Sequence, residues 1–282
     1  MRSLRGLLAG RPPIDALARH WWTAVDRRWR RFWASTAATL RRALWLARWK
    51  KRSVLSRQRT AKVSRTQQVL NALDRVVIPA VYINLTRRAD RKQNIEKELR
   101  ALDLDFVRFA AVDGRELRAH GLDEAASASL ACAMSHRDLL QAEQPGSALM
   151  VVEDDLMINC TPEYFSEVVA EFLSDTRLDV LCLAYNLSDR PVNVSKNLAI
   201  SQAVSTTACY LLKEHAREPL AQSFGESVQL FIQGESVQRA SIDQHWKKLQ
   251  RNRLMFAVPR RRIAVQGQSY SDITGKVEDR GI

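Results

Sequence analysis

From residue 76 onward, short and uniformly apolar runs alternate along the chain with longer amphipathic segments. A short apolar run is typical of a strand buried on both faces, and apolar residues at helical spacing are typical of a helix packed against such strands. The runs that predict strands are 76–85, 106–112, 148–152 and 178–184, and the segments that predict helices are 88–102, 130–142 and 162–173. This order predicts an α/β domain with a mainly parallel sheet that is covered on both faces.

The strongest chemical signal lies directly after the predicted strand 148–152, where Glu153, Asp154 and Asp155 follow one another. Ligands of such sheets bind beyond the carboxyl ends of the strands. Three adjacent carboxylates repel one another unless a cation or water neutralises them. Hard divalent cations such as Mn²⁺ or Mg²⁺ prefer carboxylate oxygens and can bridge to a diphosphate. We therefore expect a metal–diphosphate site here, and the alternative is a solvated acidic turn.

Two other predicted strand ends carry polar residues that can join this site. Asn84 lies at the end of the first strand, and Arg88 and Arg91 follow at the start of a helix, where guanidinium and backbone N–H groups attract anions. Asp113 follows the second strand and can accept hydrogen bonds from a base or a ribose. Taken alone, Asp113 is more simply explained by an ordinary Asp-Gly turn.

Residues 1–75 form a strongly basic leader. They hold 19 Lys and Arg against three acids, whereas the remaining residues carry a net charge of −3. Six of the seven Trp also lie in the leader, at positions 21, 22, 29, 33, 45 and 49. On a helical wheel, most apolar residues from Trp22 to Leu44 share one side and most Arg the other. Trp45 and Trp49 fall on the basic side, so we expect a break or twist near residue 43.

A basic amphipathic helix with Trp is typical of binding to an anionic membrane surface, because indoles settle at headgroup depth and guanidiniums meet lipid phosphates. We therefore expect residues 1–72 to bind such a surface, and we expect no specific nucleic-acid partner. A transit peptide, a nucleic-acid arm and a disordered tail are the alternatives. The longest uncharged stretch here has nine residues, against about 20 needed to span a bilayer, and no secretory signal is recognisable.

The four cysteines, Cys132, Cys160, Cys182 and Cys209, show no paired spacing. The pattern predicts neither a zinc site nor a disulfide framework. Because each cysteine has apolar neighbours, we expect buried free thiols in a reducing compartment.

The blocks INLTRRADR, AAVDG, ACAMSH and VVEDD, in this order and spacing, resemble those of glycosyltransferase family 25. The segments TACYLL and IDQHW, with Pro259, Gln266 and SDI, extend the resemblance over about residues 76–275. The family includes bacterial lipopolysaccharide galactosyl- and glucosyltransferases and collagen galactosyltransferases. The resemblance implies a single GT-A-like domain that moves galactose or glucose from a UDP-sugar to a saccharide acceptor, with inversion at the anomeric carbon.

The resemblance also implies roles for single residues. Glu153 and Asp155 would hold Mn²⁺ or Mg²⁺. The residues expected to contact the nucleotide sugar are Asn84, Arg88, Arg91, Asp113, Ser135, His136 and Asp154. Asp243 is the candidate general base, with a helix N-cap as its alternative role. Trp246 would offer an apolar platform to a sugar ring. No Gly-x-Ser-x-Gly motif frames Ser135, which argues against a serine hydrolase.

The sequence departs from the family pattern at three places. Thr86 stands where Asp is usual, Ala131 where Gly is usual, and 205–207 replace a segment that usually contains Gly. These changes can loosen the nucleotide pocket or alter sugar preference. The alternatives to an active enzyme are a degenerate nucleotide-sugar-binding protein and a basic membrane or nucleic-acid adaptor, and a metal-dependent phosphohydrolase is a third.

The expected organisation is a leader over 1–75, a glycosyltransferase domain over 76–275 and a short tail over 276–282. Because no secretion signal is recognisable, we expect a cytoplasmic enzyme, peripheral on the inner face of a bacterial membrane. A glycan or lipid-linked saccharide acceptor would be presented there, as in assembly of the lipopolysaccharide core.

Overall fold

The computed structural model describes residues 34, 36–53, 78–118, 121–142, 147–267, 269–271 and 276–278. The chain divides into two compact units, Met1–Lys51 and Arg52–Ile282. Because residues 54–77 lie outside the described part, the domain boundary predicted at residue 75 stays a prediction.

One eight-stranded sheet organises the larger unit, in the order β2-β1-β3-β10-β5-β11-β8-β7. Its strands are β1 Ala80–Asn84, β2 Phe106–Ala110, β3 Ala148–Glu153, β5 Val180–Cys182, β7 Val192–Asn193, β8 Leu198–Ser201, β10 Cys209–Lys213 and β11 Phe256–Pro259. Strands β8 and β10 run opposite to the other six, since each pairs antiparallel with both of its neighbours. The predicted α/β class with a mainly parallel sheet is confirmed, and β10 separates β3 from β5.

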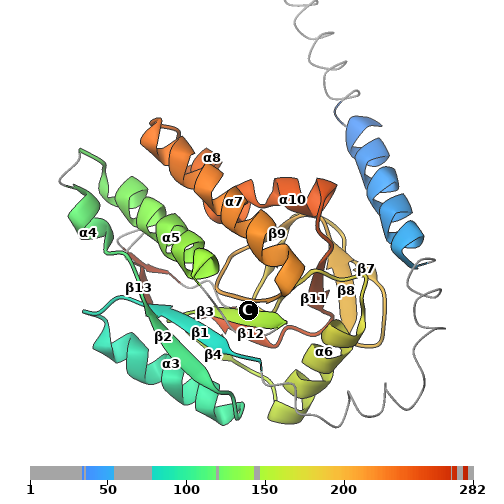
Figure 1. The fold of residues 1–282 in the computed structure, drawn as a ribbon, viewed down its shortest axis with the longest axis horizontal. Coiled ribbons are helices and arrows are strands. Elements are labelled where there is room, and N and C mark those ends of the chain that lie inside the picture. The colour runs from blue at the N-terminus through green and yellow to red at the C-terminus, as the bar shows by residue number, and fades with distance from the viewer. Residues whose placement is uncertain are drawn as a thin grey trace, which may run out of the picture. The chain divides into compact units, whose positions relative to one another are not determined.

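Helices cover both faces of this sheet. They are α3 Ala89–Ala101, α4 Gly114–Leu117, α5 Glu124–Gln141, α6 Pro162–Ser174, α7 Glu214–Ile232, α8 Val237–Ala240, α9 Ile242–His245 and α10 Lys247–Asn252. Figure 1 shows α5 and α7 on one side of the sheet and α3 and α6 on the other. The helix predicted from residue 130 begins earlier, at Glu124, because the Asp123 carboxylate accepts a hydrogen bond from Ala126 N at 2.7 Å and caps the helix. The predicted cap of α6 by Thr161, with Pro162 in the first turn, is confirmed.

Three short antiparallel pairs lie outside the main sheet. They are β4 (Leu156–Ile158) with β12 (Ala264–Gln266), β6 (Asn186–Leu187) with β9 (Val204–Ser205), and β13 (Ser269–Ser271) with β14 (Lys276–Glu278). In the first pair Gln266 lies opposite Leu156, two residues beyond Asp154. A segment from near the C-terminus therefore reaches the turn that follows β3.

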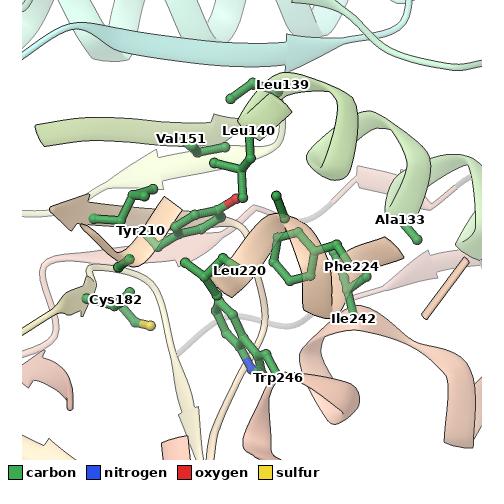
Figure 2. Packing of buried hydrophobic residues seen from close by; sticks show 14 of the residues in the cluster. Ala133, Leu139, Leu140, Val151, Cys182, Tyr210, Leu220, Phe224, Ile242 and Trp246 are labelled. Carbon is green, nitrogen blue, oxygen red and sulfur yellow. The ribbon is translucent and has the colours of Figure 1, made fainter. Parts of the chain in front are cut away.

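The main core lies between the sheet and helices α5 and α7. Figure 2 shows Val151 of β3 and Tyr210 of β10 packed with Phe224 of α7 and with Trp246. The Trp246 ring is fully buried, lies 5.1 Å from the ring of Phe256, and donates from Nε1 to the Val204 carbonyl at 3.0 Å. The expectation that Trp246 offers a platform to a sugar is therefore wrong, because none of the ring is exposed.

Part of the leader is described, and it is helical. Residues 36–53 form one continuous helix, so the break expected near residue 43 is absent from this segment. Leu40 and Leu44, one turn apart, are 61% and 63% exposed, whereas Trp45 is buried. Among the described residues, no helix is long and apolar enough to cross a membrane. Most of the predicted amphipathic face, including Trp22, lies outside the described residues.

Gly114 tests how closely α4 and α5 pack. A Cβ at this position would lie 2.9 Å from the Cα of Ala128 in α5, which is backbone and cannot move aside cheaply. We predict that Gly114→Ala lowers the free energy of unfolding by about 1–3 kcal/mol. The control is Gly225→Ala in α7, where the new Cβ meets only the Arg137 Cδ at 3.8 Å. This control should raise stability by about 0.5–1 kcal/mol. Urea denaturation measures the free energy of unfolding of each variant. Equal changes in the two variants would contradict the close packing of α4 against α5.

Candidate active site

The carboxyl ends of β1, β2 and β3 meet at one edge of the sheet, because the three strands are parallel neighbours. Glu153 ends β3 opposite Ile83 of β1, and Asp154 and Asp155 form the turn into β4. Their side chains are only 21%, 9% and 11% exposed. The three carboxylates therefore form a largely buried cluster, and the alternative of a solvated acidic turn is excluded.

Glu153 is held in place by two side chains that bond to the same carboxylate oxygen. His136 Nε2 lies 3.2 Å and Thr207 Oγ1 2.7 Å from Glu153 Oε1. Burial would raise the pKa of Glu153, but the hydrogen bond and charge of His136 and the Thr207 bond together hold this pKa below its usual value. The ionised carboxylate leaves its second oxygen, Oε2, without a protein partner among the described residues.

His136 connects Glu153 to the core. Its Nδ1 lies 3.0 Å from the Tyr210 hydroxyl, and burial, aided by the charge of Glu153, raises the pKa of Tyr210, so this hydroxyl keeps its proton. The imidazole therefore contacts Glu153 through Nε2 and the Tyr210 hydroxyl through Nδ1. Both ring nitrogens of His136 have partners and the residue is only 1% exposed, so its role is to orient Glu153. The expectation that His136 contacts the nucleotide sugar is therefore wrong.

Asp154 is tied to the first strand and the first helix. Asn84 Nδ2 donates to its Oδ2 at 2.7 Å, and Arg91 Nη1 donates to its Oδ1 at 2.8 Å. Asn84 is fixed in turn, because its Oδ1 accepts from Arg108 Nε at 3.0 Å. Burial raises the pKa of Asp154, although Arg91 opposes this effect. The structure thus places Asn84, Arg91 and Asp154 together as predicted from strand ends, but Asn84 is buried and acts on its neighbours.

Asp155 has the least compensated carboxylate of the three. Gln266 Nε2 donates to its Oδ2 at 3.0 Å, and Arg91 Nη1 lies 3.5 Å from the same oxygen. The other oxygen, Oδ1, is buried without a hydrogen-bond partner. Burial, and then the neighbouring charge of Glu153, raise the pKa of Asp155 to about 7. A cation at Oδ1 would remove this penalty.

These residues fit a hard divalent cation. A buried carboxylate oxygen without a partner is costly, and the Asp155 Oδ1 and the Glu153 Oε2 are oxygen ligands of the kind that Mg²⁺ and Mn²⁺ prefer. Asp154 is less suited, because both of its oxygens already accept hydrogen bonds. Glu153 and Asp155 are the pair of metal ligands expected from the resemblance, and their role as ligands stays a prediction.

A second group of candidate ligands lies close by. Cys132 Sγ, a ring nitrogen of His136 and a Glu153 oxygen all lie within 4.8 Å of one another. Burial, and then the charges of Glu153 and Asp243, raise the pKa of the Cys132 thiol well above its usual value. A thiol that keeps its proton is a poor ligand, and sulfur and imidazole suit softer ions than Mn²⁺. The hydrogen bonds that His136 makes to Tyr210 and Glu153 explain why these residues lie together better than a metal site does.

Asp243 lies near the triplet although it is far away in the sequence. Thr206, whose N–H donates to Asp243, is the neighbour of Thr207, whose hydroxyl donates to Glu153, and the charges of Asp243, Glu153 and Asp155 all raise the pKa of the Cys132 thiol. Asp243 does not cap α9, since Ser241 holds the cap position; its Oδ2 instead accepts from Thr206 N at 3.3 Å. The alternative role of N-cap is therefore excluded.

The backbone beside Asp243 is strained. Thr206 has φ of +71°, a region that a β-branched residue rarely adopts and that costs about 1–3 kcal/mol. This is the segment in which the family usually has Gly. The strained residue lies between Asp243, which accepts its N–H, and Thr207, which bonds Glu153. The departure from the family pattern therefore places a β-branched residue at positive φ, at an energetic cost.

The remaining predicted contacts lie around this edge. Asp113 caps α4 through Arg115 N at 3.0 Å and pairs with Arg87 at 2.8 Å. Burial would raise the pKa of Asp113, but these bonds keep it below its usual value. Arg88 pairs with Asp90 at 2.9 Å.

Ser135 is buried, and its Oγ donates to the Ala131 carbonyl at 2.7 Å and accepts from Val112 N at 2.9 Å. It therefore joins α5 to the end of the second strand and has no surface for a ligand.

Three residues that build the site received no role from the sequence. Thr207, just before β10, bonds Glu153 directly, and Tyr210 of β10 bonds His136, which in turn bonds Glu153. Gln266 of β12 bonds Asp155. All three lie at positions that carry the resemblance to family 25. That resemblance was the only sequence evidence that could have indicated a role for them. Their partners depend on strand order, which local pattern does not reveal.

Comparison with known proteins identifies the family. Residues 78–232 match the sequence profile of glycosyltransferase family 25 (LPS biosynthesis protein), which is more than half of the chain. A glycosyltransferase involved in the glycosylation of the major capsid of PBCV-1 is 10% identical and has a TM-score of 0.41, with 70% of this chain and 95% of that chain covered. Mouse xyloside xylosyltransferase 1, in its apo form, is 9% identical with a TM-score of 0.33, with coverage of 62% and 69%. No curated protein matches the sequence.

The raised pKa of Asp155 makes stability depend on pH. The folded protein holds this proton up to about pH 7, whereas an ordinary Asp releases it near 3.8, so ionised Asp155 lowers stability increasingly as pH rises through this range. We predict that Asp155→Asn melts at a higher temperature than the wild type at pH 8 without metal, and that the two converge toward pH 4. Mn²⁺ should stabilise the wild type and not the variant.

The control for this prediction has the opposite sign. A side-chain hydrogen bond from Arg88 lowers the pKa of Asp90 to about 2, so Asp90→Asn should slightly lower the melting temperature at pH 8. Differential scanning fluorimetry across this pH range measures all three proteins. If Asp155→Asn kept the pH profile of the wild type, or if Mn²⁺ stabilised Asp155→Asn as much as the wild type, the proposed roles of Asp155 as a buried acid and metal ligand would be contradicted.

Proposed function

Since the chain belongs to glycosyltransferase family 25, we propose that it transfers a hexose, galactose or glucose, from a UDP-sugar to a saccharide acceptor. The observation that carries this proposal is the cluster at the end of β3, where Asp155 Oδ1 is buried without a partner beside the ionised Glu153. Such a pair suits a divalent cation, and the adjacent guanidinium of Arg91 suits an anion.

The donor is proposed to lie over the carboxyl ends of β1, β2 and β3. Glu153 and Asp155 would hold Mn²⁺, with Mg²⁺ as the alternative. When bound, the cation supplies positive charge against the diphosphate of the departing UDP. Arg88 and the first turn of α3 would bind the same anion, and Asp113 at the end of β2 would bind the base or ribose. Arg91 neutralises part of the acidic cluster and keeps Asp154 in position.

Asp243 is proposed as the general base. In an inverting transfer the acceptor oxygen attacks the anomeric carbon as the bond from that carbon to UDP breaks, and the acceptor hydroxyl gives its proton to a carboxylate. Asp243 is half-buried, it accepts from Thr206 N, and the next residue, Thr207, donates to Glu153.

The acceptor is proposed to be a lipid-linked or cell-surface glycan such as the lipopolysaccharide core, reached from an anionic membrane surface. Two observations support this: the family's description as LPS biosynthesis proteins, and the basic, Trp-rich composition of residues 1–72. The exposed pair Leu40 and Leu44 on the described part of the leader helix agrees with an apolar contact face.

One alternative has its own structural support. A degenerate protein that binds a nucleotide sugar without transferring the sugar would keep the acidic cluster, and the strained Thr206 marks a departure beside the base. A metal-dependent phosphohydrolase is less well supported, because such enzymes usually need several metal ligands, often His. Among the described residues, a single His lies beside the acidic cluster, and both of its ring nitrogens already contact Glu153 and Tyr210.

The activity itself is tested by incubating the full chain with UDP-galactose or UDP-glucose, Mn²⁺ and a panel of saccharide acceptors. UDP release that requires an acceptor, with a product of inverted anomeric configuration by NMR, is the expected result. UDP release without acceptor would indicate hydrolysis, and donor binding without release would indicate the degenerate protein.

Asp243→Asn tests the base directly. We predict a fall in kcat of about 10²-fold or more with little change in donor binding, because the amide cannot take the proton but can still accept the hydrogen bond from Thr206 N. The control is Asp189→Asn, which lies in a polar network with Ser201 away from the triplet and should leave kcat unchanged. Normal turnover by Asp243→Asn would place the base elsewhere.

The leader is tested by deletion of residues 1–51, which hold 13 of its 19 basic residues and all six of its Trp. The deletion ends there because Arg52 Nη1 donates to the buried Asp179 carboxylate at 2.6 Å, a partner that a deletion to residue 72 would remove. Each basic residue near an anionic surface contributes about 1 kcal/mol, so the full chain should co-sediment with anionic vesicles and the shortened chain should not.

The shortened chain should still bind UDP-sugar and use a detergent-solubilised acceptor. Vesicles without anionic lipid serve as the control, at low and high salt. Equal partitioning of both forms would refute the membrane role, and binding of the full chain to RNA or DNA but not to vesicles would support the nucleic-acid alternative.

A further inference from the structure

The end of strand β12 holds the turn that carries Asp155. β12 pairs antiparallel with β4, so Gln266 lies opposite Leu156, the residue directly after that turn. Gln266 Nε2 donates to the Asp155 carboxylate at 3.0 Å, and the N–H of the next residue, Gly267, donates to the Asp155 carbonyl at 2.6 Å. Two consecutive residues from near the C-terminus therefore hold both the side chain and the backbone of Asp155.

Gly267 lets these two segments approach closely. A Cβ at this position would lie 2.8 Å from the Met157 Sδ and 3.1 Å from the Asp155 carbonyl oxygen, which is closer than side-chain atoms normally pack. Any larger residue would have to displace Met157 or the end of β12. The absence of a side chain at 267 therefore permits the approach that brings the Gln266 amide within hydrogen-bond distance of the Asp155 carboxylate.

The two oxygens of the Asp155 carboxylate have different surroundings. Oδ2 accepts from Gln266 Nε2 and lies 3.5 Å from Arg91 Nη1, whereas Oδ1 is buried without a hydrogen-bond partner. The same Arg91 nitrogen lies closer to another acid, since it donates to Asp154 Oδ1 at 2.8 Å. The Gln266 amide is therefore the group that fixes the rotation of the Asp155 carboxylate and leaves Oδ1 for a cation.

A neutral amide suits this place better than a charged group. A carboxylate at 266 would add to the repulsion within the acidic cluster, and an ammonium or guanidinium would compete with a metal ion for the charge of Asp155. An amide N–H donates to Oδ2 and leaves that charge in place. Groups that hydrogen-bond a ligating carboxylate orient it, and their loss commonly lowers metal affinity about 10- to 100-fold.

We propose that Gln266 is a positioning residue for the cation site, because its amide holds Oδ2 of Asp155 and thereby presents Oδ1 to the divalent ion. The assignment rests on the proposed function, in which Asp155 is a ligand of Mn²⁺ or Mg²⁺. Gln266 lies outside residues 78–232, which match the family profile. The cation site thus depends on a segment beyond that match.

The test measures the affinity of the full chain for Mn²⁺, with and without UDP, by electron paramagnetic resonance of the free ion. Gln266→Met removes the amide from a side chain of similar length, and its affinity should be about 10-fold or more lower than that of the wild type. Gln266→Asn keeps the amide on a side chain one methylene shorter. The same fall is expected, because the shorter amide does not reach Oδ2.

The matched control is Gln244→Met. Gln244 Nε2 donates to Asp243 Oδ2 at 3.1 Å, so this variant loses the same kind of bond to a carboxylate that is not a proposed metal ligand. Its affinity for Mn²⁺ should equal that of the wild type. Urea denaturation without metal gives the free energy of unfolding of each variant, and so shows whether a fall in affinity merely follows a loss of stability.

Unchanged Mn²⁺ affinity in Gln266→Met, or an equal fall in Gln244→Met, would overturn the proposal. Full affinity in Gln266→Asn would also overturn it, since any polar side chain at 266 would then suffice. The proposed function is decided separately by hexose transfer. Transfer by a wild type that binds no Mn²⁺ would refute the positioning role alone, whereas Mn²⁺ binding with the expected variant effects but without transfer would refute the function alone.

Discussion

Three consecutive carboxylates at the end of a buried strand can persist only if separate parts of the fold stabilise each of them, because their mutual repulsion is strong where water is scarce. Glu153 is held from α5 and the approach to β10, Asp154 from β1 and α3, and Asp155 from α3 and β12. Elements from across the larger unit therefore converge on one edge of the sheet. The negative charge of the triplet is thus stabilised by several elements, but at Asp155 one carboxylate oxygen has no hydrogen-bond partner.

The incomplete compensation gives the site its chemical character. The pKa of Glu153 is lowered and that of Asp155 is raised to about 7, first by burial and then by the charge of Glu153, so the pair divides into one ionised group and one that readily holds a proton. A hard cation would replace that proton, so its binding is coupled to proton release and to stability. The proposed base, Asp243, comes from a different region of the chain and is fixed by the strained backbone of Thr206.

Local sequence pattern predicted the parts of this structure that depend on local physics. Apolar runs located β1, β2, β3 and β5, and the position of the triplet after β3 predicted a site at that edge. Pattern did not reveal that Trp246 is buried, because a Trp between two short helices is compatible with either environment. Nor did it reveal that His136 serves Glu153 through a chain from Tyr210, since that contact depends on antiparallel β10 lying between β3 and β5.

The central claim is that the acidic cluster at the end of β3 is a cation site that positions a nucleotide diphosphate. The most direct measurement is anomalous diffraction from crystals of the full chain grown with Mn²⁺ and UDP. We predict a single strong manganese peak bound by Asp155 Oδ1 and Glu153 Oε2 and in contact with the diphosphate. A peak held instead by Cys132 and His136, or bound UDP with no manganese at the triplet, would contradict this account.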